Sequence, residues 1–434
     1  MAGPSSFALP TPSHQGLLHR AWRALPAGAR RAALGQVTAW LAPRPDPVSS
    51  PPSGGMIVAG EIATPNGLGQ SARAMHHALT RLGVPVWTLD AGLPGGSATR
   101  GGLPPEVPPA APLMLHVNAP MLPYALLRLP RGLVRGRRVI GYWAWELPTL
   151  PPSWRAGQRF VHEVWAMSHF TAAALAPHLS PHIVLRVVPI PLALSPPRPS
   201  ALGRADFGLP AQAVVVLVSF NLASSFARKN PLAAIAAHKA AFGARPDRIL
   251  LLKIGNPDHF PADMATIRAA AADAGNIRID TRTLPAVDAY ALTACADIVL
   301  SLHRSEGFGL VPAEAMLLGR AVVATGWSGN MDFMDSDSAA LVAPNLIPAR
   351  DARGVFEAPG AMWADPDPLE AAQHLRRLAD DAQARDALAQ RGRAMATARL
   401  GADAVLAGLR GLGLIPEALA EATSPPPRVM FPAL

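Results

Sequence analysis

The sequence predicts an α/β protein of two domains in which short strands alternate with helices. In both halves of the chain, apolar runs of strand length end in polar or glycine-bearing loops that lead into helical patterns. A length of 434 residues suffices for two ordinary domains, each with its own core. A proline-dense segment at residues 189–199 is typical of a linker. We therefore expect an extension at 1–54, a first domain at 55–197, a second domain at 198–395 and a last segment at 396–434.

Composition narrows the classes of protein and partner. Half of the residues are hydrophobic, which excludes a disordered chain. The net charge of +9 comes almost wholly from arginine and fits phosphorylated ligands or an anionic membrane surface. Nucleic acid is the alternative anion, but the sequence has neither zinc-finger spacing nor an aromatic RNA-binding motif, so we expect no nucleic-acid partner. Cys295 is the only cysteine, which excludes an internal disulfide.

The extension at 1–54 is rich in Pro, Ser, Ala and Gly, a composition typical of a mobile segment. It lacks a secretion leader, and no apolar run in the chain reaches the ~20 residues that span a bilayer, so the expected location is the cytoplasm. Residues 17–25 and 30–34 nevertheless form basic amphipathic patterns that end near Trp40 and Leu41. They are either an anchor to the inner face of a membrane or part of an extension that folds onto nothing.

The first domain opens with a strand at 56–60 and a loop that contains Gly67, Leu68 and Gly69, followed by a helical pattern. A strand, a glycine loop and a helix resemble a nucleotide-binding unit, although the loop lacks both the dinucleotide spacing and the lysine of a P-loop. The glycines would let the backbone approach a ligand closely. Alternatively, they form only a tight turn.

Two later strands carry polar groups or aromatic rings at their carboxyl ends, the edge where open α/β sheets bind ligands. His116 and Asn118 end the strand at 113–118, and the histidine either contacts a ligand or is structural. The next strand ends in Trp143-Ala144-Trp145-Glu146, whose aromatic faces and carboxylate suit a carbohydrate. Because aromatic clusters usually belong to the core, we expect a core role for one of the two tryptophans.

The second domain begins with a strand at 213–220, a polar loop and Arg228-Lys229-Asn230-Pro231 before a helix. Two cations at the start of a helix oppose its dipole, so they predict an anion between them and the helix. Alternatively, they are a solvated surface pair. Strands at 249–255 and 276–280 follow, and the helix around 287–295 leads into the next motif.

That motif consists of an apolar strand at 297–300, a glycine-bearing turn, a helix and a second strand. The amides of residues 307–310 would point out of the helix N-terminus, where the dipole favours an anion. Glu306 and Glu314 flank this position, with seven residues between them. Two acceptor-only carboxylates beside an anion site suggest a ligand with phosphate and hydroxyl groups. Alternatively, one acid caps the helix and the other is solvated.

The segment from Glu306 to Thr325, together with Arg228-Lys229-Asn230-Pro231, closely resembles the E-x7-E and R-K-N-P segments of retaining glycosyltransferases of family four, which have the GT-B fold. Residues 143–148 and 162–168 are similar to the W-x-W-E-x-P and D-E-[IV]-W-x-x-S segments of these enzymes, with His162 in place of the first acid. The resemblance covers about residues 56–400. It implies two Rossmann-like domains that face each other across a ligand cleft, with the last helix returning to the first domain.

The resemblance also implies roles for individual residues. Glu306 would face the donor sugar and Glu314 would hold the ribose of the nucleotide. The expected catalytic residues are Glu306, His116, Lys229 and Arg228. The two cations would bind the donor diphosphate, and the remaining donor-binding positions would be Gly307, Phe308, Gly309, Leu310, Thr283 and Leu284. The acceptor side of the cleft would be formed by Gly67, Leu68, Gly69, Asn118, Trp145 and Glu146.

The implied activity is transfer of a hexose from a nucleotide-diphosphate sugar to an acceptor hydroxyl, with the anomeric configuration retained. The acceptor would be a saccharide or a lipid-linked saccharide in polysaccharide, lipopolysaccharide or glycoconjugate biosynthesis. No acidic metal motif is apparent, so we expect neither a metal ion nor another cofactor. Arg228, Lys229 and the amides of residues 307–310 would then stabilise the leaving diphosphate, and domain closure would exclude water.

Two alternatives belong to other functional classes. A sugar-nucleotide epimerase of the same fold would act on the donor without an acceptor. A non-catalytic partner subunit would be expected to have lost Lys229 or Glu306, and both are present.

Overall fold

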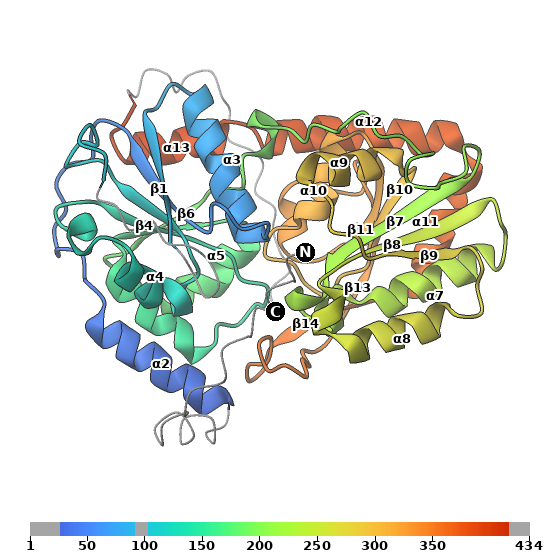
Figure 1. The fold of residues 1–434 in the computed structure, drawn as a ribbon, viewed down its shortest axis with the longest axis horizontal. Helices are drawn as coiled ribbons and strands as arrows, with labels where there is room; N and C mark the ends of the chain where they lie inside the picture. Colours follow the sequence, from blue (N-terminus) through green and yellow to red (C-terminus); the bar gives the residue numbers. More distant parts are fainter. Residues whose placement is uncertain (1–26, 92–102, 416–434) are drawn as a thin grey trace, which may run out of the picture.

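A computed structural model of the chain describes residues 27–91 and 103–415. It contains two parallel sheets of six strands, each with helices packed around it, placed side by side (Figure 1). We call the unit that contains the first sheet the first domain and the unit that contains the second sheet the second domain. Between the two sheets the chain runs through residues 188–213, which include the predicted linker.

The first sheet has the strand order β2-β1-β3-β4-β5-β6, and all of its neighbouring strands are parallel. Its central strands are buried along their whole length, as expected for a sheet covered on both faces. The chain passes from β1 to β2 in one direction and then continues from β3 in the other, so the strand order reverses between β1 and β3. The strands are β1 (Met56–Gly60), β2 (Val86–Asp90), β3 (Leu113–His116), β4 (Val139–Trp143), β5 (Glu163–Ala166) and β6 (Val184–Val187).

The second sheet has the order β12-β11-β10-β7-β8-β9 and is also parallel. Here the strand order reverses between β7 and β10. The strands are β7 (Val214–Asn221), β8 (Arg248–Gly255), β9 (Ile277–Asp280), β10 (Ile298–Ser301), β11 (Ala321–Thr325) and β12 (Ala340–Val342). A separate antiparallel hairpin follows β12 and consists of β13 (Pro344–Pro348) and β14 (Met362–Pro366).

Side-chain caps fix where several helices begin. Asn66 caps α3 through the amide of Gly69 at 2.8 Å, and Ser168 caps α5 through the amide of Thr171 at 3.1 Å. Asp367 and Asp381 cap α11 and α12 in the same way. The helices are α3 (Gly67–Arg81), α4 (Leu122–Arg128), α5 (His169–Leu175), α6 (Phe226–Lys229), α7 (Pro231–Phe242), α8 (Pro261–Ala271), α9 (Ala286–Cys295), α10 (Leu310–Leu317), α11 (Pro368–Asp380), α12 (Ala382–Arg399) and α13 (Asp403–Gly411).

The chain returns to the first domain through its last two described helices. α12 packs on α10 and β11 of the second domain and reaches the connection that follows β6. α13 then lies on the first domain (Figure 1), where Gly408 contacts the ring of Trp165 on β5. This path agrees with the return helix that the family resemblance implies.

The described part of the N-terminal extension packs on the first domain, which contradicts the interpretation that the extension folds onto nothing. α2 (Ala27–Leu41) contacts α4 and a 3₁₀ helix at Pro152–Phe160, and Thr38 and Ala42 are buried there. Further along, the backbone of Ser50 donates to the carbonyl of Gly136 at 2.8 Å. The helix docks through small side chains, a face that a search for large apolar residues overlooks. The predicted pattern at residues 17–25 lies outside the described residues.

Candidate functional site

The points where the two sheets reverse their strand order hold most of the predicted site. In an open α/β sheet, the loops that leave the two strands at such a point diverge and leave room for a ligand at the carboxyl edge. In the second sheet, the loop after β7 leads to Arg228 and Lys229, and the loop after β10 carries Glu306. In the first sheet, the loop after β1 leads to Gly67, Leu68 and Gly69, and His116 and Asn118 lie at the end of β3 and just after it.

Arg228, Lys229 and Glu306 form one charged cluster. Arg228 Nη1 donates to Glu306 Oε2 at 3.0 Å, and Lys229 Nζ donates to Glu306 Oε1. Arg228 also donates to the carbonyls of Ser305 and Ser224, both at 2.9 Å, and is almost fully buried. Glu306 thus contacts two cations that lie 77 and 78 positions before it in the sequence.

The predicted position of the two cations at the start of a helix was wrong. Arg228 and Lys229 lie at the end of the one-turn helix α6 and not at the start of α7. Asn230, in the left-handed conformation at φ 50°, separates the two helices, and Pro231 begins α7. The cations therefore do not oppose a helix dipole, because the carboxyl end of a helix favours positive charge. What favours an anion here is the charge of the two side chains.

Burial and charge act against each other in this cluster. Burial alone would raise the pKa of Glu306, but Lys229 and Arg228 outweigh it and lower that pKa to about 2. Burial lowers the pKa of Lys229, and Glu306 only partly offsets this effect. Glu306 is therefore ionised at any physiological pH and acts as a hydrogen-bond acceptor.

Several buried polar atoms beside the cluster have no hydrogen-bond partner within the described residues. They are Arg228 Nε, Asn230 Nδ2 and Ser305 Oγ. Buried polar atoms in folded proteins are normally paired, so unpaired atoms around two cations are the environment expected for a polar ligand.

Glu314 lies in a contact between the two domains. Its carboxylate accepts a hydrogen bond from Gln70 Nε2 of α3, and Gln70 Nε2 also lies 3.3 Å from the hydroxyl of Tyr290. Burial raises the pKa of Glu314 to about 7, although hydrogen bonds from Gln70 and Tyr290 act in the opposite direction. Glu314 thus titrates near neutrality, whereas Glu306 does not.

His116 is fully buried at the end of β3. Its Nδ1 lies 2.8 Å from Ser71 Oγ, and its ring stacks on Tyr142 with centroids 4.3 Å apart. Nε2 has no partner in the part of the chain that the structure describes. Burial lowers the pKa of His116 to about 3, so the ring is neutral. A neutral histidine with one unpaired ring nitrogen can exchange a hydrogen bond with a hydroxyl group.

The prediction of a loop at Gly67–Gly69 was wrong, because Asn66 caps α3 and these three residues form the first turn of that helix. A Cβ at Gly69 would lie 2.4 Å from the carbonyl oxygens of Glu61 and Thr64, so only glycine fits there. Gly67 is exposed and faces Leu310 of the second domain, and Leu68 is half-buried. Asn118 is half-buried, and its Oδ1 accepts from the amide of Ala144 at 2.9 Å.

The tryptophan segment departs in part from its prediction. Trp143 and Trp145 are both buried, where we expected a core role for one. The Trp145 ring packs against Trp154 and stacks on Phe356, so it presents no open face to a sugar in this conformation. Glu146 does reach the site, with Oε1 3.8 Å from Arg228 Nη2, and burial raises its pKa although Arg228 acts in the opposite direction.

The loop before α10 touches the first domain. The carbonyl of Gly307 accepts from Ser168 Oγ at 2.6 Å, and a Cβ at Gly307 would lie 3.1 Å from the carbonyl of Trp145. Gly309 has a φ of 99°, which favours glycine, while the Phe308 side chain is buried beside Phe333. Phe308 and Leu310 can therefore offer a ligand their main-chain groups more readily than their side chains.

Two of the predicted donor-binding positions follow a different strand from those that lead to the charged cluster. Thr283 is exposed and Leu284 is half-buried, both after β9 at the edge of the second sheet. Within the described residues, no hydrogen bond joins either residue to Arg228, Lys229 or Glu306.

Sequence reasoning missed Gln70, Tyr290, Ser71 and Phe356, all of which contact predicted site residues. Gln70 lies 244 positions from Glu314, and nothing in its local pattern indicates that contact. Ser71 had a weak signal, because it lies in the helix that begins with the glycine turn.

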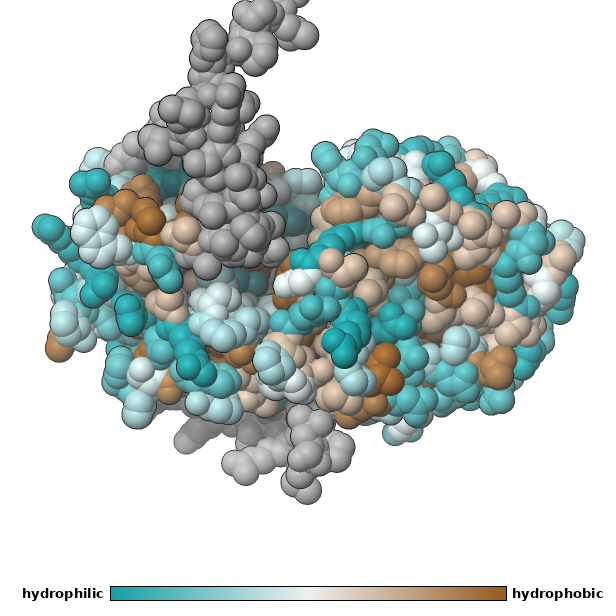
Figure 2. All heavy atoms as spheres, turned by 90° about the horizontal axis from the view of Figure 1, so that it is seen from below, coloured by the Kyte–Doolittle hydropathy of each residue, from teal (hydrophilic) through white to brown (hydrophobic). Residues whose placement is uncertain are grey.

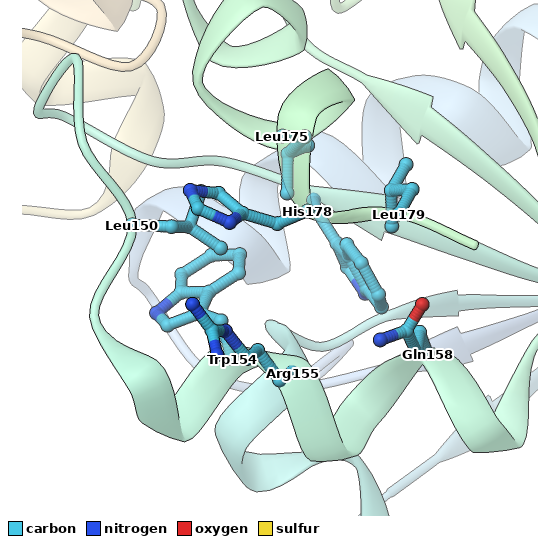
Figure 3. Close-up of a pocket in the computed structure, with 8 residues that line it drawn as sticks. Leu150, Trp154, Arg155, Gln158, Leu175, His178 and Leu179 are labelled. Atoms are coloured by element: carbon cyan, nitrogen blue, oxygen red, sulfur yellow. The ribbon is translucent and has the colours of Figure 1, made fainter.

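A cavity in the first domain lies away from these residues. Trp154, Arg155 and Gln158 of the 3₁₀ helix line one side, and Leu175, His178 and Leu179 line the other (Figure 3). Trp143 also lines it, but none of the residues with a predicted catalytic, donor or acceptor role does. Among the described residues, no group of three or more His, Cys, Asp or Glu side chains is arranged to hold a metal ion.

Two facing Rossmann-like domains, with charged loops at the reversal point of the second sheet, define the GT-B class of proteins. Residues 223–381 match the family model described as "Glycosyl transferases group 1". This match lies within the second domain, which is similar to the group 1 glycosyltransferases, and the fold of the whole chain is GT-B. No curated protein matches the chain.

Solved structures support the fold over most of the chain. HepE from Anabaena, in complex with UDP and glucose, is 16% identical with a TM-score of 0.56, covering 82% of this chain and 98% of its own. Sucrose-phosphate synthase from Thermosynechococcus elongatus is 16% identical with a TM-score of 0.59, covering 85% of this chain and 100% of its own. WaaG, a glycosyltransferase involved in lipopolysaccharide biosynthesis, is 15% identical with a TM-score of 0.51, covering 82% and 98%.

Proposed function

We propose that the protein transfers a sugar from a nucleotide-diphosphate sugar to an acceptor hydroxyl and retains the anomeric configuration. The observation that carries the proposal is the buried cluster of Arg228, Lys229 and Glu306 at the reversal point of the second sheet, which faces Glu146 of the first domain. The match to group 1 glycosyltransferases and the UDP and glucose seen in HepE support this assignment.

In this proposal the leaving diphosphate takes Arg228 and Lys229 as its counter-ions. Both side chains already lie in a buried site, so they need little rearrangement when negative charge develops on the leaving group. The proposal includes no metal ion and no other cofactor. Glu306, ionised and held by the same cations, accepts hydrogen bonds from hydroxyls of the donor sugar and orients it.

The other site residues divide between donor and acceptor. Glu314 accepts from the ribose hydroxyls, His116 Nε2 contacts the donor sugar, and a donor phosphate oxygen helps to remove the proton of the acceptor hydroxyl. Glu146 and the Gly67–Gly69 turn face the acceptor, which we propose to be a saccharide or lipid-linked saccharide of a cell-surface glycan. Domain closure would exclude water, because hydrolysis of the donor competes with transfer.

Titration calorimetry with UDP, ADP and GDP, followed by their sugar derivatives, tests the proposal. We expect one nucleotide to bind and its sugar derivative to be turned over only when an acceptor is present. Lys229→Ala should reduce turnover about a hundredfold, because it removes a preorganised cation from the leaving group. Lys239→Ala is the control, because Lys239 forms an ion pair with the exposed Asp273 and not with the residues of the charged cluster.

Three outcomes would contradict the proposal. Binding of no nucleotide or nucleotide sugar would exclude a transferase of this kind. Unchanged turnover in Lys229→Ala would remove the cluster from the mechanism. Isomerisation of the donor without an acceptor would instead identify an epimerase.

We also propose that α2 places the protein on an anionic membrane. Leu34, Val37 and Leu41 follow the i, i+3, i+7 spacing of one helix face, and all three are exposed beside the buried Thr38. Trp40 beside them is 80% exposed, and tryptophan favours the membrane interface. Seen from the side where α2 lies in Figure 1, the first domain shows hydrophobic surface among polar residues (Figure 2).

Charge favours an anionic membrane as the partner of this face. Arg44 follows α2, and Arg131 and Arg135 are exposed on the segment that the chain after α2 packs against. Exposed arginines next to an apolar helix face are attracted to anionic lipids. Within the described residues, no helix combines the length and the apolar character needed to cross a bilayer. The proposed contact is therefore a surface contact.

Vesicle sedimentation tests this contact. The protein should bind vesicles of phosphatidylglycerol and phosphatidylcholine more than vesicles of phosphatidylcholine alone, and Trp40→Gln with Leu41→Gln should remove most of the bound fraction. Leu369→Gln, an exposed apolar residue at the start of α11 in the second domain, is the matched control. Equal binding of the α2 variant and wild type, or loss of binding in the control, would contradict the proposal.

A further inference from the structure

An aromatic residue of the β13–β14 hairpin reaches the charged cluster from outside both sheets. Phe356 lies in the segment 349–361 that joins the two strands, and it is only 7% exposed. The proposed mechanism gives it no role. We propose that Phe356 is a positioning residue that fixes the Arg228 guanidinium for the donor diphosphate, an inference that rests on the proposed function.

The Phe356 ring contacts both sides of the site. The guanidinium carbon of Arg228 lies over this ring, 4.9 Å from its centroid. The same ring stacks on Trp145 of the first domain, with centroids 5.7 Å apart and planes inclined by 25°. A guanidinium over an aromatic face in a desolvated site gains a cation–π attraction that a solvated contact lacks. Phe356 therefore holds Arg228 from the face, while Glu306 holds it from the edge.

The hairpin segment is tied to the loop that carries Arg228. Asp351 Oδ2 accepts from the amides of Val355 at 3.0 Å and Phe356 at 3.2 Å. Its other oxygen, Oδ1, accepts from Ser225 Oγ at 2.9 Å. Ser225 Oγ in turn accepts from the amide of Arg228 at 3.3 Å. Asp351 thus fixes the position of the Phe356 backbone relative to the Arg228 backbone.

This geometry leaves two of the five arginine N–H groups without a hydrogen bond to the described residues. Both N–H groups of Nη1 are bonded, one to Glu306 and one to the carbonyl of Ser305, and one N–H of Nη2 is bonded to the carbonyl of Ser224. Nη2 also lies 3.8 Å from Glu146 Oε1 of the first domain. Nε is buried and has no partner within the described residues. With the guanidinium held on its face and edge, Nε–H is directed rather than mobile. The ligand chemistry that suits a fixed cationic donor beside Lys229 is a phosphate oxygen.

The test compares the nucleoside diphosphate that binds the wild type, among UDP, ADP and GDP, with its nucleoside. Phe356→Leu keeps an apolar side chain but removes the aromatic face. It should weaken binding of the diphosphate about fivefold to tenfold and leave nucleoside binding within about twofold. Phe356→Tyr keeps the face and should bind both ligands within about twofold of wild type.

Phe260→Leu is the matched control, because Phe260 packs against the guanidinium of Arg353 at 3.8 Å and does not touch Arg228. It should leave both affinities unchanged. Asp351→Asn is a second variant that weakens the tether, and it should reproduce the selective loss of the diphosphate. Circular dichroism on each variant reports folding.

Two results would overturn the inference. Equal loss of nucleoside and diphosphate binding in Phe356→Leu would show general damage to the site, and unchanged diphosphate binding would show that the ring does not position Arg228. Failure of the wild type to bind any of the three nucleotides would overturn the proposed function itself, and this inference with it.

Discussion

The two glutamates that flank the glycine turn have opposite electrostatic environments although their sequence positions look alike. Glu306 has two cations as neighbours, which lower its pKa to about 2 against the effect of burial. Glu314 has only neutral partners, Gln70 and Tyr290, so burial dominates and raises its pKa to about 7. Sequence spacing predicts that both acids lie near the ligand. It does not predict this difference, because the partners of Glu314 come from α3 and α9.

The raised pKa of Glu314 predicts a pH-dependent cost to stability. Between the ordinary value of 4.5 and about 7, the folded protein binds more protons than the unfolded chain, so its free energy of unfolding falls as pH rises through this window. Above pH 7 the cost is complete. Glu314→Gln removes it, so the variant should gain up to about 3 kcal/mol over wild type at pH 8 and little at pH 4.

Denaturant unfolding of the ligand-free protein at both pH values measures this difference. Glu106→Gln, at an exposed position in the first domain, is the control and should show the same small effect at both pH values. A gain for Glu314→Gln that does not change with pH would show that packing, and not ionisation, is responsible.

At the scale of elements, the sequence predicted the strands better than the peripheral pieces. Apolar runs such as 56–60, 297–300 and 321–324 became β1, β10 and β11, because strands buried on both faces need continuous apolar sequence. The hairpin β13–β14, the 3₁₀ helix at Pro152–Phe160 and the docking of α2 were not predicted. Prolines interrupt or bound these pieces, and tertiary contacts fix them more than local periodicity does. Phe356, which the hairpin carries to Arg228, was missed for this reason.

The docking of α13 on the first domain gives a prediction for this element. A Cβ at Gly408 would lie 2.5 Å from the ring of Trp165, whose indole nitrogen donates to the buried Glu163 at 2.8 Å. Gly408→Leu should therefore push α13 off β5 and lower the free energy of unfolding by about 1–3 kcal/mol, the usual cost of overpacking. Ala407→Leu, on the exposed side of the same helix, should change it little. Thermal unfolding compares the two variants. Equal stability of Gly408→Leu and Ala407→Leu would show that the packing of α13 on β5 does not contribute to stability.

At the scale of the whole molecule, the two domains touch at the proposed site itself. Ser168 Oγ donates to the carbonyl of Gly307, and the amide of His169 donates to Asp332 Oδ2 at 2.8 Å. Gln70 joins α3 to Glu314 of α10 across the same boundary. The GT-B fold followed from the family resemblance of the sequence. These contacts did not, because each depends on how the domains are placed and not on either domain alone.

Gln70 and a nucleotide would compete for the same carboxylate. If Glu314 accepts from the ribose, as proposed, the hydrogen bond from Gln70 must break before or during binding. A hydrogen bond to a charged group contributes about 1.5–3 kcal/mol to stability. The hydrogen bond from the ribose to Glu314 offsets part of the free energy that is lost when the Gln70 hydrogen bond breaks. Gln70→Ala should therefore tighten nucleoside binding by up to about tenfold, measured by titration calorimetry above pH 7, where Glu314 is ionised.

Gln158→Ala is the control for this variant, because Gln158 bonds to Ser180 within the first domain and not across the boundary. It should leave nucleoside binding unchanged. Weaker binding by Gln70→Ala would reverse the interpretation, because Gln70 would then be holding the nucleotide and the two domains would close on the ligand from both sides. Tighter or weaker nucleoside binding would each show that Gln70 acts at the nucleotide site. Only tighter binding supports a ligand-free state in which Gln70 of the first domain occupies the ribose position beside Glu314.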